Sequence, residues 1–182
     1  MTLRLATVAD LPALRDLIPR SVRALSREFY TERQIESAIR YVFGPDTRLI
    51  DDGTYFVVEA EDGVLAGCGG WSRRRTLYGG DQTKTTEDDL LTPDEPARVR
   101  AFFVEPAFAR HGVATRLLMA CAEAAETAGH RTLTLAATLP GEAFYRRHGF
   151  TSDERFETVL PDGTSIAFVR MSRHVGDPAR LP

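Results

Sequence analysis

The stretch VRAFFVEPAFARHGVA at residues 99–114 decides the fold. Residues 98–104 are largely apolar and predict a strand in the middle of a sheet. A short loop containing Arg110 and Gly112 follows, and residues 114–128 carry apolar side chains at helical spacing. A helix N-terminus has unpaired backbone N–H groups and a partial positive charge. This strand, loop and helix therefore predict an anion-binding site, in which Gly112 allows close approach and Arg110 adds charge.

The loop differs from two familiar phosphate-binding motifs. It is not GxGxxG, and it lacks the Lys-Ser/Thr pair of a P-loop. The sequence therefore gives little support to a function as a dinucleotide-dependent dehydrogenase or a nucleoside triphosphatase.

The rest of the chain predicts a mixed α/β sheet rather than a doubly wound parallel one. Thr7 with Asp10, and Thr31 with Gln34, resemble capping boxes that open two helices, the first of which should stop near Pro19. A polar loop is expected over residues 76–96. The remaining expectations are strands at residues 3–6, 54–60, 64–71, 132–136, 155–160 and 165–171, and a short helix at 141–148.

Composition sets the outer limits. The 182 residues suit one domain, which we place at residues 2–171, with a frayed tail at 172–182. The net charge of −3 argues against a nucleic-acid partner, and no apolar run approaches the ~20 residues that cross a membrane. Two cysteines without CxxC spacing and four scattered histidines predict neither a disulfide scaffold nor a metal site. We expect a cytoplasmic protein.

Two motifs in this order resemble the GNAT superfamily of acyl-CoA-dependent N-acetyltransferases. The first is Arg110-x-Gly112-x-Ala114 between strand and helix, and the second is AFYRRHGF at residues 143–150, after the next strand. The likeness is strongest over residues 98–150 and extends more weakly over 2–171. It implies a mostly antiparallel central sheet that is splayed between its fourth and fifth strands and flanked by helices.

The resemblance also implies a site for acetyl-CoA as co-substrate, without a metal. The family pairs the backbone of its fourth strand with the pantetheine arm, which here falls on Phe102, Phe103 and Val104. The loop that wraps the pyrophosphate falls on Arg110, His111, Gly112, Val113, Ala114 and Thr115. The family's usual general acid falls on Tyr145, whose phenol could donate to the departing CoA thiolate.

The implied reaction transfers acetyl directly to a primary amine through a tetrahedral intermediate, so neither Cys68 nor Cys121 needs to be a nucleophile. The fourth strand holds no carboxylate that could serve as general base. Glu105, Glu142 and a water chain are open substitutes. The family's frequent Asn after the fifth strand is replaced here by Thr138.

The acceptor is expected to be a small molecule, with a protein amine left open. Phe29, Tyr30, Trp71 and Arg73 are candidate substrate-binding residues, although each could equally be core or solvated surface. The rival functions are acyl transfer from a longer acyl-CoA and non-catalytic sensing of an acyl-CoA. A homodimer is also open, because relatives are commonly dimers and the last strands could pair across an interface.

Overall fold

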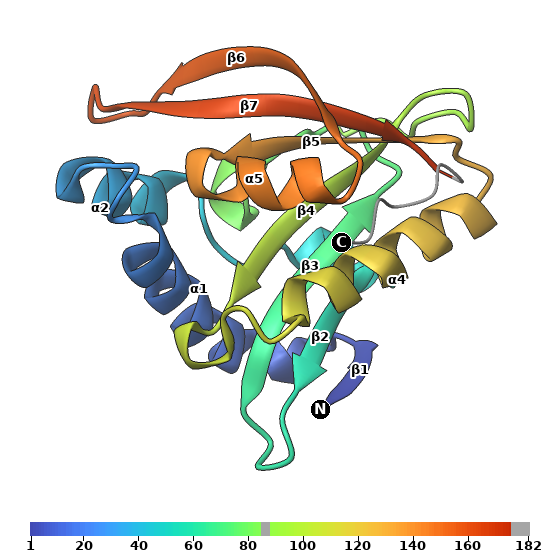
Figure 1. Ribbon diagram of the computed structural model, residues 1–182, viewed down its shortest axis with the longest axis horizontal. Coiled ribbons are helices and arrows are strands. Elements are labelled where there is room, and N and C mark those ends of the chain that lie inside the picture. Colours follow the sequence, from blue (N-terminus) through green and yellow to red (C-terminus); the bar gives the residue numbers. More distant parts are fainter. Residues whose placement is uncertain (85–87, 176–182) are drawn as a thin grey trace.

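The computed structural model describes residues 1–84 and 88–175. These residues form a central seven-stranded sheet with helices packed around it (Figure 1). The strands lie in the order β1-β2-β3-β4-β5-β7-β6. Their bounds are Thr2–Leu5 for β1, Tyr55–Glu59 for β2, Leu65–Ser72 for β3, Ala97–Val104 for β4, Thr132–Thr138 for β5, Thr151–Val159 for β6 and Ser165–His174 for β7.

The centre of the sheet is split between β4 and β5. Neighbouring strands pair antiparallel except these two, which run parallel and pair only at Ala97 with Leu133 and at Arg98 with Thr134. Beyond Arg98 the two strands diverge, whereas β5 stays paired with β7 along its full length. The predicted mixed α/β fold with a splayed fourth and fifth strand is confirmed.

Helices cover both faces of this sheet. One buried cluster joins the sheet to the early helices, which are α1 at Leu11–Ser26, α2 at Glu32–Tyr41 and α3 at Thr47–Asp51. Two further clusters join the opposite face to α4 at Val113–Thr127 and α5 at Leu139–Arg147. In Figure 1, α4 and α5 lie in front of the strands and α1 and α2 lie at the left. At the split between β4 and β5, each face of the sheet is therefore covered by its own set of helices.

The predicted end of the first helix near Pro19 is wrong, because α1 continues to Ser26 with Pro19 inside it. Proline removes one backbone hydrogen bond and disfavours a helix interior. Leu14, Leu17, Ile18 and Val22 nevertheless bury one continuous face of α1 on both sides of the proline. Packing of this face outweighs the local penalty, and the longer helix carries Ser21 and Ser26 to the split in the sheet.

Other local expectations had mixed outcomes. The capping box at Thr31 is confirmed: its hydroxyl accepts from Gln34 N–H at the start of α2. The short helix α3 was not predicted. β7 runs to His174, opposite Thr132, so residues 172–174 belong to the sheet rather than to the predicted tail. Residues 176–182 of that tail lie outside the described part. Among the described residues, no helix is long and apolar enough to cross a membrane.

Candidate functional site

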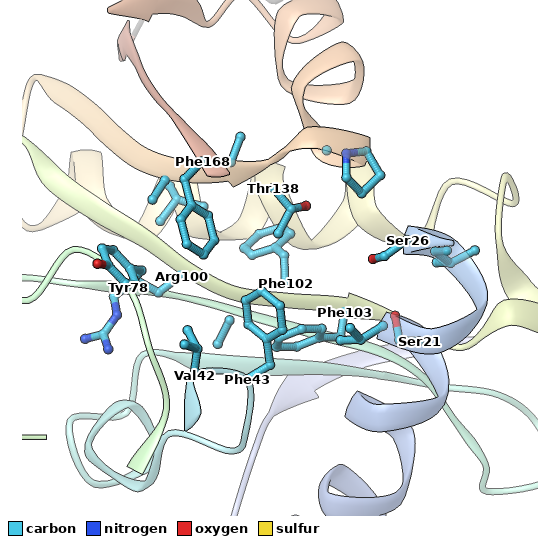
Figure 2. Close-up of a pocket in the computed structure, with 18 of the residues that line it drawn as sticks. Ser21, Ser26, Val42, Phe43, Tyr78, Arg100, Phe102, Phe103, Thr138 and Phe168 are labelled. Atoms are coloured by element: carbon cyan, nitrogen blue, oxygen red, sulfur yellow. The ribbon is translucent and has the colours of Figure 1, made fainter. Parts of the chain in front are cut away.

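A cavity of about 240 Å³ occupies the split between β4 and β5. Residues 99–104 of β4 line one side and residues 136–138 of β5 the other. Figure 2 shows Phe43 and Phe168 approaching the same space from different elements, with Ser21 and Ser26 projecting from α1. Lining residues come from both sets of helices: Tyr145 on α5 and Ala114 on α4, and Val22 on α1. The cavity therefore connects the two faces of the sheet.

A bulge in β4 decides which side chains face which end of this cavity. Gly69 of β3 stands opposite two residues, Ala101 and Phe102, because the register shifts between Cys68–Phe103 and Gly70–Arg100. Ala101 has a φ of 55°, which is rare for a residue with a side chain. As a result Arg100, Ala101 and Phe103 all face the α1–α3 side, and Phe102 packs on the α4–α5 side.

The same strand presents backbone groups to the gap. Glu105 N–H donates to Ala66 O of β3, whereas Val104 N–H points the other way and donates to Ser21 Oγ at 3.1 Å. Backbone groups alternate along a strand, so those of Phe102 face the gap with Val104, and those of Phe103 face β3. The unpaired edge predicted to hold an extended ligand is thus made by Phe102 and Val104, with Ser21 already bonded to part of it.

The predicted phosphate loop lies at the start of α4, beside the cavity. Arg110, His111 and Gly112 are exposed, and both Arg110 and Gly112 have positive φ, at 67° and 79°. A Cβ added to Gly112 would meet nothing within 4 Å, so its role is conformational freedom and open approach. The backbone N–H groups that begin α4 have no acceptor within the helix. This loop has the geometry and charge to receive an anion.

The next residues of the loop are more enclosed. Val113 is buried against Gly67 of β3, where an added Cβ would come within 2.7 Å of Val113 Cγ1. Ala114 lines the cavity. Thr115 Oγ1 lies 3.1 Å from His148 Nε2, which ties α4 to the end of α5. Of the six predicted loop residues, the structure exposes three and packs three.

Tyr145 lines the α4–α5 end of the cavity from the last turn of α5. Its side chain is 8% exposed and packs edge-on against Phe102, Phe144 and Phe150, with ring centroids 5.0–6.3 Å apart. Within the described residues its hydroxyl has no hydrogen-bond partner. Burial, and secondarily the nearby Cys121, raise the pKa of Tyr145 well above its ordinary value. The phenol therefore keeps its proton at neutral pH.

The opposite end of the cavity is aromatic. Tyr78 stacks on Phe168 with ring centroids 5.1 Å apart, and Phe43 meets Phe103 and Phe168 edge-on at 5.8 and 6.2 Å. All four rings line the cavity. Tyr78 is fixed by a 2.7 Å hydrogen bond between its hydroxyl and Thr158 Oγ1 of β6. We call Phe43, Tyr78, Phe103 and Phe168 the aromatic end.

Arg100 is the charged residue among the described cavity lining. Its guanidinium points away from the rings of Phe102 and Phe103 (Figure 2). Nη2 donates to Gly79 O at 2.7 Å and lies 2.8 Å from Asp46 Oδ2, an ion pair without hydrogen-bond geometry. Asp46 also pairs with Lys84 at 2.7 Å. Burial lowers the pKa of Arg100, and Asp46 opposes that shift. This buried ionic cluster fixes the segment that carries Tyr78.

The four candidate substrate-binding residues all lie elsewhere in the described structure. Phe29 is half exposed, and Arg73 is exposed beside Arg74, which pairs with Asp52. Trp71 is buried, with its ring edge-on to His130 at 5.9 Å. Tyr30 is buried; its hydroxyl donates to Ala167 O and accepts Leu139 N–H at the start of α5. None of them lines the cavity as described, so their contact with substrate stays a prediction.

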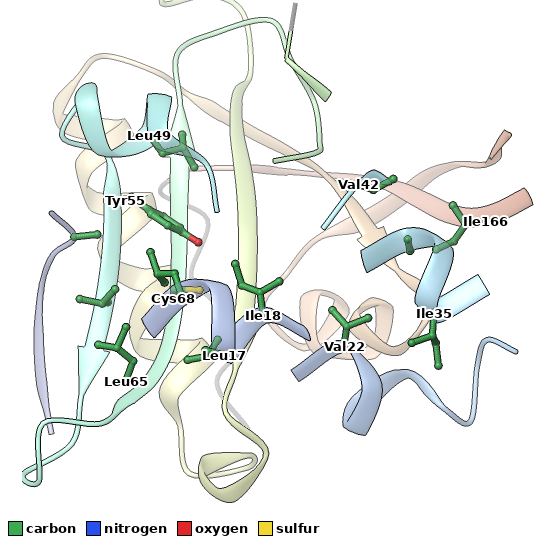
Figure 3. Close-up of a cluster of buried hydrophobic side chains, with 14 of the residues drawn as sticks. Leu17, Ile18, Val22, Ile35, Val42, Leu49, Tyr55, Leu65, Cys68 and Ile166 are labelled. Carbon is green, nitrogen blue, oxygen red and sulfur yellow. The ribbon is translucent and has the colours of Figure 1, made fainter. Parts of the chain in front are cut away.

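The acid–base and nucleophile candidates are also accounted for. Glu105 pairs with Arg20 at 2.9 Å, and Glu142 pairs with Arg146 at 2.7 Å; neither is among the cavity-lining residues described. Cys68 lies buried beside Tyr55 (Figure 3), and burial raises the pKa of its thiol to about 12. Burial likewise raises the pKa of Cys121. Within the described residues, no group of acidic, His and Cys side chains could hold a metal ion.

Several lining residues were missed by the sequence analysis. Arg100 could have been found, because one charged residue inside an apolar strand needs a buried partner. Phe43 and Tyr78 lie in segments without regular structure, and Phe168 lies in a strand whose apolar face gives no sign of a ligand. Ser21 and Ser26 were lost because the helix was ended at Pro19.

Comparison with known proteins places this geometry in a family. The model of the acetyltransferase (GNAT) family matches residues 19–150. Among solved structures, a GCN5-related N-acetyltransferase from Rhodopseudomonas palustris superposes with a TM-score of 0.70 at 19% identity, covering 95% of this chain and 94% of that chain. PaiA N-acetyltransferase from Thermoplasma acidophilum, solved with coenzyme A, gives 0.64 at 15% identity, covering 95% and 98%. No curated protein matches the chain.

A ribosomal-protein-alanine N-acetyltransferase from Brucella melitensis gives a TM-score of 0.61 at 20% identity, covering 96% of this chain and 99% of that chain. These identities are low, so the three structures show the shared fold. The family model spans well over half of the chain. The chain therefore belongs to the GNAT acetyltransferase family, whose members are acyltransferases that use acetyl-CoA.

Proposed function

We propose that the chain transfers acetyl from acetyl-CoA directly to the primary amine of a small molecule. The observation that carries this proposal is a cavity in the split between β4 and β5, lined by residues from both faces of the sheet. The phosphate-loop candidate and Tyr145 lie at its α4–α5 end, and a separate aromatic end opens on the α1–α3 side. Two reactants can therefore enter from opposite faces and meet without a covalent enzyme intermediate.

The residues present fit acetyl-CoA. The start of α4 offers unpaired N–H groups and Arg110 for the pyrophosphate, and Gly112 keeps the approach open. The free edge of β4 at Phe102 offers backbone groups for the pantetheine amides. Ser21 would exchange its bond to Val104 N–H for one to the ligand. When bound, acetyl-CoA supplies the activated acetyl group.

Tyr145 is the residue proposed to stabilise the leaving thiolate. Burial keeps its proton in place, and the hydroxyl is free of any partner within the described residues. A thiol has a pKa of about 8.5 and a phenol about 10, so full proton transfer to a thiolate is uphill. We therefore assign Tyr145 a hydrogen bond that stabilises the leaving sulfur, with the final proton coming from the amine or from water.

We propose that water, or no group at all, acts as the general base for the acceptor amine. The described cavity lining includes no carboxylate, and the nearest sequence candidates, Glu105 and Glu142, are held in ion pairs. An alkyl ammonium loses its proton with a pKa of about 10.4. An apolar cavity favours the neutral form further, so the amine can enter as its free base from solution.

Two variants test the assignment. Tyr145→Phe removes only the hydroxyl, and we expect turnover to fall ~100-fold or more, while calorimetric affinity for acetyl-CoA stays unchanged. Arg110→Glu should instead abolish that affinity, and Arg15→Glu, an equal charge change on the exposed side of α1, should not. Tight acetyl-CoA binding without turnover in the wild type, for any amine, would favour the sensor.

A further inference from the structure

We infer that the acceptor is a primary amine on an uncharged aromatic or apolar body, held by the aromatic end of the cavity. The inference rests on the proposed function and names the substrate class of the same site. Its first support is shape: four rings from four different segments converge on one end of the cavity (Figure 2). Rings arranged edge-on and offset-stacked give an apolar or aromatic body favourable contact.

The second support is charge. No carboxylate is found in the cavity lining of residues 1–84 and 88–175, so a second ammonium of a polyamine would be buried without a partner. Arg100 already shares Asp46 with Lys84 and donates to Gly79 O. A ligand carboxylate would have to compete with Asp46 for that guanidinium. The aromatic end therefore disfavours both a second positive charge and a carboxylate.

The third support is the way in. A second, open hollow of about 470 Å³ lies between α2 and the end of β6, and shares Val42, Leu77 and Tyr78 with the cavity. Tyr78, bonded to Thr158, stands as the partition between the two. No residue of the loop at the start of α4 is among the described lining of this hollow, so we assign the approach of the amine to this side. The size and position of the Tyr78 ring then limit which bodies reach the split.

A panel of amines tests the inference with the intact chain. The probes are 2-phenylethylamine, phenylalanine, which adds a carboxylate, and spermidine, which adds positive charges, each with acetyl-CoA and read by mass spectrometry and CoA release. We expect kcat/KM for 2-phenylethylamine to exceed the other two at least ~100-fold, because a buried unpaired charge is costly. Preference for phenylalanine or spermidine would overturn the acceptor class and leave acetyl transfer standing. Failure to acetylate any amine would overturn the proposed function itself.

Tyr78→Leu tests the residue that divides the two hollows. It should raise KM for 2-phenylethylamine ~10-fold, the scale of one lost aromatic contact, while KM for acetyl-CoA stays unchanged. The matched control is Tyr41→Leu, since Tyr41 lines only the second hollow in the described structure. Equal effects of the two variants on the amine, or a change in KM for acetyl-CoA alone, would overturn the role given to the aromatic end.

Discussion

Replacing Arg100 by methionine should both destabilise the chain and loosen its acceptor site. The side chains of Arg100 and Asp46 are 2% and 0% exposed. Removing one member of a buried ion pair typically costs ~3–5 kcal/mol. Lys84 remains 2.7 Å from Asp46, so we expect the lower end of that range. At this chain length that loss lowers Tm by about 6–12 °C.

Urea unfolding measures the loss as a shift in midpoint at constant slope. Arg75→Met is the control, because Arg75 is 56% exposed and an ion pair at the surface, such as the one with Glu95, adds little stability. The double variant Arg100→Met/Asp46→Leu should recover part of the stability, because Asp46 is no longer left facing an empty site and Lys84 keeps its pair with Asp81. The recovery stays partial because Leu49 N–H loses its acceptor on Asp46. Equal losses from Arg100→Met and Arg75→Met, or a double variant worse than either single one, would refute the reasoning.

The same variant has a functional readout. Arg100 holds Gly79 O at 2.7 Å, next to Tyr78 in the wall of the aromatic end. Arg100→Met should therefore raise KM for the amine while leaving the affinity for acetyl-CoA near the wild-type value. A selective loss of acetyl-CoA affinity instead would show that the ionic cluster supports the wrong end of the cavity.

Three further outcomes follow from the structure. Gly69→Ala would put a Cβ 2.6 Å from the Phe102 ring. Carbon contacts need about 3.5–4.0 Å, so the ring, which packs on Tyr145, must move ~1 Å and turnover should fall ~10-fold or more, whereas unchanged turnover would contradict this. Asp10→Ala removes the acceptor of the Thr7 N–H, and we expect about 1–2 kcal/mol less stability at pH 7 by urea unfolding. The hydrogen bond from Arg4 lowers the pKa of Asp10 in the folded chain. The stability that Asp10 adds is therefore fully present above its unfolded pKa near ~4 and is lost as the pH falls through its lower folded pKa. Wild type and variant should therefore have similar stability in acid. Because burial raises the pKa of Tyr145, kcat/KM should climb with pH as the amine deprotonates and show no descending limb below pH ~10; a fall near pH 8 would speak against this acid.

Much of the fold was predictable because its signals are local. The apolar run at residues 98–104 and the capping box at Thr31 each fix an element through its own neighbours. The end of α1 could not be predicted in this way. The helix persists through Pro19 because its buried face packs on the sheet, and that contact joins residues far apart in the sequence.

The two ends of the cavity also differ in whether local sequence signals predict them. The phosphate-loop candidate and Tyr145 follow motifs with fixed spacing, so the sequence located them, and their roles remain predictions. The aromatic end combines Phe43, Tyr78, Phe103 and Phe168 from four separate segments, brought together by the bulge at Ala101 and by the ionic cluster at Arg100. Neither cause has a local sequence signature. Trp71 and Arg73 are not among the described cavity-lining residues, and their contact with substrate stays a prediction.

Direct transfer through the split sheet is the central claim, and labelled acetyl-CoA tests it most directly. The wild-type chain is mixed with acetyl-CoA labelled on the acetyl carbons, first alone and then with 2-phenylethylamine, and both protein and amine are analysed by mass spectrometry after a rapid quench. We predict no label on the protein in either case and a labelled N-acetyl amine in the second, formed at a rate that Tyr145→Phe reduces. Label on a peptide containing Cys68 or Cys121 that then passes to the amine would contradict direct transfer.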